Sequence, residues 1–173
     1  MIGRPGPDEA VAYYFKYIDR IQTEDVVGEL ESQLDEAVGF FRGVSEEKSL
    51  DRYGQDKWSV RQVLNHVNDC ERLFVFRAMW FARGFDSDLP SFDQVVAAAH
   101  APSDGIPWAN HVEEFRGIRQ STVAFFRHLP PEAWMRSGIA SGNRFTVRAL
   151  AYIAAGHLAH HSAVLREKYL LAR

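Results

Sequence analysis

Apolar residues recur every three or four positions through most of this chain, and this period constrains the fold more than any other feature. Such spacing places the apolar side chains along one stripe of a helix. The stripe is clearest at Val27, Leu30, Leu34, Ala37 and Phe41. Four long stretches show the pattern and are predicted to be helices, at about residues 24–42, 59–84, 107–128 and 147–170.

Residues typical of helix ends flank these stretches. Ser59 and Gln62 have the S-x-x-Q spacing of a capping box, in which each side chain bonds the backbone of the other. Thr23 and Thr146 are predicted N-caps of the first and last long helices, because a Thr hydroxyl accepts a bond from an unpaired backbone N–H. Gly84 is predicted to stop the second long helix.

Two shorter helices are predicted at residues 8–20 and 92–99, the second with Ser91 and Gln94 at capping-box spacing. No segment alternates between apolar and polar residues, and Ser141-Gly142-Asn143 is predicted only as a turn. The sequence therefore predicts an all-α fold, a four-helix bundle with additional short helices.

Length and charge narrow the class of protein. The 173 residues suit one helical domain, 1–173, in which a short segment, 1–22, precedes the bundle. The net charge of −3 argues against a nucleic-acid partner, since such proteins usually carry a basic excess. No apolar run reaches the roughly 18 residues that span a membrane, and residues 1–7 lack the apolar core of a signal peptide. The single cysteine suits a reducing compartment, so a cytoplasmic protein is predicted.

Seven histidines and one cysteine limit any metal chemistry to histidine with oxygen ligands. His157 and His161 lie about 40° apart on one helix surface, on the stripe that faces the bundle interior. Such a pair either begins a transition-metal site or forms hydrogen-bonded core residues. His66 is the best candidate for a third ligand. Its neighbour Cys70 is either a further ligand or, as we prefer, a small buried apolar side chain.

The other four histidines are predicted to lie outside the metal site. His160 falls at the edge of the stripe, beside the ligands or exposed. The remaining three are predicted on the surface, near helix ends or on polar faces: His100, His111 and His128.

Two segments resemble the motifs of a known family. A second-helix motif is matched by Trp58-Ser59-Val60, His66, Asp69 and Glu71. A last-helix motif is matched by Gly156-His157, His161 and the run Val164-Leu165-Arg166-Glu167-Lys168-Tyr169. Both resemble the DinB-like (YfiT-type) family of small helical metal proteins, over about residues 24–170.

The resemblance implies a divalent transition metal, nickel, zinc or a similar ion, held by His66, His157 and His161. The branch it most resembles includes the bacillithiol- and mycothiol-dependent S-transferases. It therefore implies a small-molecule substrate and transfer of a low-molecular-weight thiol cosubstrate to an electrophile, often in detoxification. Dimers occur in the family, so a homodimer is a further expectation. The aromatic segment 13–17 is either its contact or a peripheral core cluster.

Asp69 and Arg77 are the candidates for catalytic roles. Asp69, three residues after His66, could orient a ligand or act as a base. Arg77 could hold a substrate carboxylate or lie with its charge at the bundle edge. Glu71 is expected on a solvated face or in a salt bridge with Arg72 or Arg77.

The function class stays open between an enzyme and a binding protein. Leu158 stands where an H-E-x-x-H metalloprotease carries its glutamate, so that chemistry is excluded. Three protein ligands leave a coordination position free, which is typical of a catalytic metal. The enzyme would be a metal-dependent thiol S-transferase or, as variants, a hydrolase or isomerase. The binding protein would be a non-catalytic bundle that holds a metal or ligand.

Overall fold

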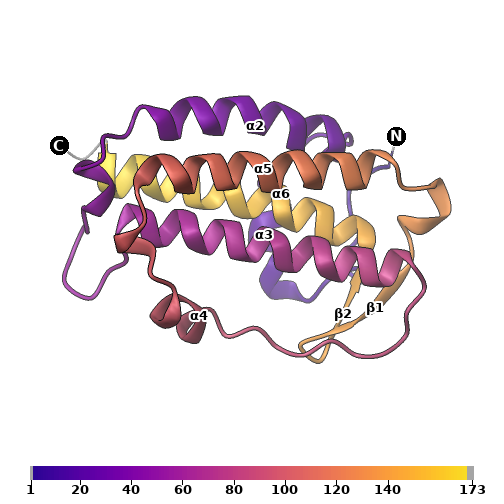
Figure 1. Cartoon of the computed structure of the whole chain (residues 1–173). Coiled ribbons are helices and arrows are strands. Elements are labelled where there is room, and N and C mark those ends of the chain that lie inside the picture. The colour runs from indigo at the N-terminus through magenta and orange to yellow at the C-terminus, as the bar shows by residue number, and fades with distance from the viewer. Residues whose placement is uncertain (1, 171–173) are drawn as a thin grey trace.

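Four long helices run side by side in the structure, a computed structural model that describes residues 2–170 (Figure 1). Helices α3 and α2 each pack against both α5 and α6, so the four form a ring around the core. This confirms the predicted four-helix bundle. Within the described residues, none of the helices is both long and apolar enough to cross a membrane. The long helices are α2 (Val26–Arg42), α3 (Val60–Ala82), α5 (Trp108–Arg127) and α6 (Val147–Val164).

Short helices lie between and beyond the long ones, as predicted. The stretch at residues 8–20 is not one helix but two short turns, η1 and α1. The last long helix ends at Val164 and continues as one π-helical segment. The short elements are η1 (Ala12–Tyr14), α1 (Phe15–Ile18), η2 (Lys48–Leu50), α4 (Gln94–His100), η3 (Ser103–Gly105), η4 (Pro131–Ala133) and η5 (Leu165–Leu170).

The predicted caps of α3 and α6 are confirmed. The Ser59 hydroxyl accepts from the backbone N–H of Gln62 at 3.1 Å, and Gln62 Oε1 accepts from the backbone N–H of Ser59 at 3.0 Å. The Thr146 hydroxyl accepts from the N–H of Ala149 at 3.0 Å. These bonds fix where the two histidine-bearing helices begin, and so fix the turn on which each histidine falls.

Two predicted caps are wrong by two residues. Asp25, not Thr23, caps α2, and its carboxylate accepts from the N–H of Gly28 at 3.0 Å. Asp93, not Ser91, caps α4. In both places an aspartate stands closer to the first helical residue, and its carboxylate reaches the free N–H groups of the first turn.

A β-hairpin precedes α6, so the prediction of a chain without strands is wrong here. Strand β1 (Ser137–Ala140) pairs antiparallel with β2 (Asn143–Thr146). Ser141 and Gly142 form the two-residue loop with φ of 53° and 72°, the positive values of a type I′ turn. Strands of four residues are too short to show an alternating pattern in the sequence.

A buried polar network crosses the middle of the bundle between two apolar clusters. The Arg119 guanidinium on α5 donates to both carboxylate oxygens of Glu71 on α3, each at 2.8 Å. It also donates to Gln33 Oε1 and the Leu30 carbonyl on α2, at 2.9 and 3.3 Å. Gln33 Nε2 donates to the carbonyl of Ala155 on α6 at 3.3 Å. This Arg119 network therefore connects all four long helices.

The N-terminal segment packs on α6 through a close backbone approach. A Cβ added at Gly156 would lie 2.1 Å from the carbonyl oxygen of Tyr17. Only glycine lets α1 lie this close to α6, and this contact brings the Tyr17 ring to the ring of His157, with centroids 5.1 Å apart.

We expect Gly156→Ala to lower the free energy of unfolding by about 1–3 kcal/mol, because the new methyl group displaces α1 from α6. Thermal unfolding measures the change. Gly39→Ala is the matched control: Gly39 also lies inside a long helix, but its Cβ would meet nothing within 4 Å. That substitution should raise stability slightly through helix propensity. Equal effects of the two substitutions would contradict the close approach.

We also expect Glu71→Leu to lower the free energy of unfolding by about 3–5 kcal/mol, because it leaves the Arg119 charge buried without a counter-charge. The double variant Glu71→Leu/Arg119→Met removes both charges and should lose less than Glu71→Leu alone. Urea unfolding compares the three proteins. If the double variant lost the sum of the single losses, the two charges would not act as a pair.

Candidate metal centre

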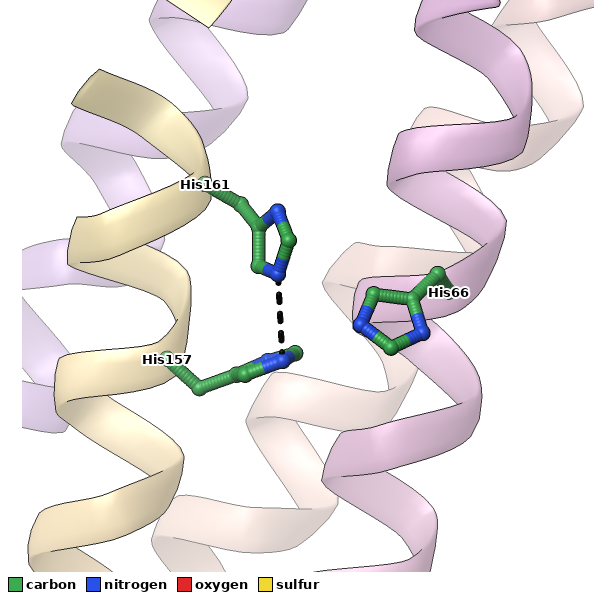
Figure 2. A group of neighbouring side chains, drawn as sticks. All are labelled: His66, His157 and His161. Atoms are coloured by element: carbon green, nitrogen blue, oxygen red, sulfur yellow. Dashed lines mark hydrogen bonds between the residues drawn. The ribbon is translucent and has the colours of Figure 1, made fainter. Parts of the chain in front are cut away.

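Three histidines from two facing helices converge inside the bundle (Figure 2). His66 projects from α3, and His157 and His161 project from successive turns of α6. One nitrogen from each imidazole lies within 4.8 Å of the other two. The sequence therefore placed the three predicted residues correctly on helix faces that meet.

Aromatic rings surround this cluster and hold the imidazoles in place. The ring of Trp58 lies 5.1 Å from that of His66, and the rings of Tyr17 and Phe74 lie 5.1 and 5.6 Å from that of His157. His66 and His157 are buried and His161 is half-buried. The cluster therefore lies in a largely dry part of the bundle that still has an outlet at its edge.

Burial favours the neutral form of these imidazoles. It lowers the pKa of His66 from the usual 6.5 to about 4. Burial, together with the neighbouring histidines, lowers the pKa of His161 to about 3 and that of His157 well below its usual range. Neutral imidazole, with a free lone pair, is the form that binds metal ions.

The spacing of the two donors on α6 fits a divalent transition metal. The Nε2 atoms of His157 and His161 are 3.2 Å apart. Two imidazoles on a tetrahedral zinc, with bonds of about 2.0–2.1 Å, place their nitrogens roughly 3.3 Å apart. Three imidazoles suit zinc, nickel, iron or copper, so the donor set does not select among them.

Comparison with known families agrees with this architecture. The model of the DinB superfamily matches residues 29–165, most of the chain and all three histidines. The chain belongs to the DinB superfamily. No curated protein sequence matches this DinB chain.

A solved structure shares the fold. It is YfiT from Bacillus subtilis, described as a probable metal-dependent hydrolase with an unusual four-helix bundle topology. The alignment covers 94% of this DinB chain and 91% of YfiT, with a TM-score of 0.65 and 18% sequence identity. At that identity the likeness establishes the common bundle topology.

A cavity of about 480 Å³ opens beside the histidine cluster of the DinB chain. His157 and Cys70 line one part of it, and Arg77 and Ser141 line another. Arg77 is 2% exposed, so its side chain does not lie at the bundle edge. Its Nη2 donates to the Pro90 carbonyl at 3.2 Å and to Ser141 Oγ at 2.9 Å.

Cys70 and His160 flank the cluster without joining it. Cys70 is buried, as predicted, with its sulfur 3.5 Å from His66 Nδ1, and burial raises the pKa of its thiol to about 12. The ring of His160 lies against those of Tyr17 and His161, at 5.5 and 5.0 Å. The group of three convergent ligand atoms includes neither residue.

Asp69 interacts with Asn65 and Arg72 rather than with the histidines. Its carboxylate accepts from Asn65 Nδ2 at 2.9 Å and lies 3.7 Å from Arg72. Burial raises the pKa of this carboxyl. Asp69 and His66 both line a narrow cleft under α4, so Asp69 lies near the site. Its catalytic role stays a prediction.

Two of the predicted placements are wrong. Glu71 is not solvated or paired with Arg72 or Arg77 but lies in the buried Arg119 network. His111 is not on the surface but fully buried, with Nε2 2.9 Å from the Ser103 carbonyl. The two other histidines predicted on the surface are exposed: His100 and His128.

The sequence pattern did not place Tyr14, Tyr17 and Ser141 at the cavity, although all three line it. Tyr14 and Tyr17 lie in the aromatic segment 13–17, which marked a cluster of rings without indicating its partner. Ser141 stood out only as a turn residue. Their positions depend on α1 and the hairpin folding back onto the bundle, which no local pattern predicts.

We expect the purified DinB protein, reconstituted with zinc or nickel, to hold about one metal ion per chain. His66→Ala, His157→Ala and His161→Ala should each weaken the affinity about 100-fold or more, since loss of an outer partner alone costs 10–100-fold. Elemental analysis and a chelator competition measure this. His160→Ala is the matched control and should bind as the natural protein does. Equal binding by the His157→Ala and His160→Ala proteins would contradict the three-histidine site.

Proposed function

We propose that this protein is a metal-dependent enzyme that transfers a low-molecular-weight thiol to a small electrophile. His66, His157 and His161 would hold a divalent transition metal, nickel, zinc or a similar ion. The observation that carries the proposal is the convergence of three imidazoles inside the bundle, one of which, His157, lines a cavity large enough for a small molecule.

The chain positions the three histidines, buries them and leaves a cavity through which a substrate can reach them. Three protein ligands leave at least one coordination position for a substrate. When bound, such a metal lowers the pKa of a water or thiol, so that a nucleophile is available near neutral pH. His157 lines the cavity together with Tyr17 and Phe74, whose rings pack against its imidazole. The substrate would therefore approach the cluster along the His157 side.

The reacting sulfur would arrive with a cosubstrate. Cys70 is the only cysteine, and its side chain is buried against His66. The Cys70 side chain lines the cavity, but in this buried position its sulfur cannot move to an electrophile bound farther along the cavity. Asp69, in the cleft it shares with His66, is our candidate for holding a proton close to the site.

A second candidate function is hydrolysis on the same site. It is favoured by the shared fold with YfiT, which is described as a probable metal-dependent hydrolase. An isomerase and a non-catalytic metal-binding bundle would also use three histidines at a cavity. The cytoplasmic location, the homodimer and the single domain stay predictions.

We expect the metal-loaded protein to accelerate the conjugation of cysteine with monochlorobimane. A C–S bond forms, a C–Cl bond breaks, and chloride and a proton are released, so fluorescence reports each turnover. A parallel assay with 4-nitrophenyl acetate and no thiol measures hydrolysis. Metal-free protein and His157→Ala should fall to the uncatalysed rate in whichever assay is active.

His128→Ala serves as the control, because His128 is exposed and far along α5 from the cluster. It should retain full activity. Acceleration only with thiol supports transfer, and acceleration only in the ester assay supports hydrolysis. Metal binding without acceleration in either assay would favour a non-catalytic bundle, and rates that survive in His157→Ala would exclude this site.

A further inference from the structure

Arg77 is a buried cation that lines the cavity and has no anionic partner. Its side chain is 2% exposed, and no ion pair among residues 2–170 includes it. Its partners are neutral: Nη2 donates to the Pro90 carbonyl and the Ser141 hydroxyl, and the Tyr14 phenol also lies against the guanidinium. Its Nε is buried and has no hydrogen-bond partner in the described part of the chain.

The contrast with Arg119 shows what is missing. Arg119 is equally buried and uses Nε, Nη1 and Nη2, with both carboxylate oxygens of Glu71 as counter-charge. An unpaired buried charge costs several kcal/mol. Burial lowers the pKa of Arg77, but a guanidinium stays charged at any pH a protein meets. Within residues 2–170 the charge is therefore uncompensated, and a bound anion would supply the partner.

We propose that the cavity binds the carboxylate of a small amphipathic molecule, with Arg77 as its receptor. A guanidinium presents parallel N–H groups that match the two oxygens of a carboxylate. Binding of the carboxylate at Arg77 does not depend on the proposed function. The inference rests on that function only for the reaction of the ligand's other end at the histidine cluster. Arg77 would thus be a positioning residue, and the compound an organic acid whose reacting group lies several bonds from its carboxylate.

Apolar side chains, among them Leu73, Phe74 and Phe92, also line the cavity, and they define the rest of the ligand. The Phe74 ring lies 5.6 Å from the ring of His157 and 6.3 Å from that of Tyr14, so aromatic side chains connect the cluster to the Arg77 end. An apolar body would pack along these rings and bring its reacting group to His157.

The charges at the cavity favour a monoanion over a phosphate. Asp93, which caps α4, also lines the cavity and adds one negative charge. One guanidinium beside one carboxylate leaves little capacity for a dianion. A carboxylate therefore fits the site better than a phosphate group does.

Calorimetric titration with 3-phenylpropionate and its neutral amide, 3-phenylpropionamide, tests this inference on metal-free and metal-loaded protein. The acid should bind about 10- to 100-fold more tightly than the amide, the range of a charge-assisted hydrogen bond. Arg77→Met should reduce the acid to the affinity of the amide. Arg83→Met is the matched control, because it removes an exposed positive charge from the end of the same helix and should change nothing.

Two further variants test the charge without altering Arg77, in case Arg77→Met fails to fold. Asp93→Asn keeps an N-cap for α4 but removes the competing charge, so the acid should bind more tightly. Ser91→Glu adds a negative charge at an exposed position on the cavity wall, so the acid should bind more weakly. The amide should respond to neither substitution.

Equal affinity of acid and amide, or tighter binding of inorganic phosphate than of the acid, would overturn the inference. So would an acid affinity that Asp93→Asn and Ser91→Glu leave unchanged. Failure of the metal site is separately visible: a protein that binds the acid through Arg77 but holds no metal supports the inference and refutes the proposed function. A protein that holds metal but binds the acid no more tightly than the amide refutes the inference and leaves the proposed function standing.

Discussion

The Arg119 guanidinium in the middle of the bundle is the contact on which the rest of the structure depends. Its bonds to Glu71 and Gln33, and the bond from Gln33 to the Ala155 carbonyl, join α5 to α3, α2 and α6. Sliding any one helix along its axis would break a buried hydrogen bond of this network, whereas apolar packing tolerates small shifts. Ala155 lies two residues before His157, so the same network sets the height at which α6 presents its histidines to α3.

Much of this arrangement could be predicted from helical phase and capping residues. Ser59 and Thr146 fix the starts of α3 and α6, and the spacing of their apolar residues fixes which face of each helix is buried. His66, His157 and His161 fall on those faces. Two helices that bury those faces in one bundle bring the three imidazoles together whatever the details of packing, so local information was sufficient for the cluster.

What could not be predicted depends on contacts between distant segments. The sequence did not single out Arg119 as a buried residue, although it lies between Phe115 and Thr122 on the core side of α5. It could not show that Glu71 is the partner, because that requires knowing which helices are neighbours. For the same reason the cavity was not predictable: its walls come from η1, α1, α3, α6, the hairpin and the start of α4, which meet only in the folded chain.

The buried polar groups of this bundle fall into two kinds: those whose hydrogen-bonding atoms all have partners within the chain, and those that keep atoms without one. Arg119 and Glu71 use theirs within the chain, and their contribution is to hold helices in register. Arg77 keeps unused capacity, an Nε–H without a partner among the described residues, whereas His157 and His161 bond each other through their Nε2 atoms. Burial makes unused capacity costly, so a fold gains nothing from it unless an external group completes the bonds. Arg77 and His157 line the same cavity, which is why a single bound molecule could engage both of them.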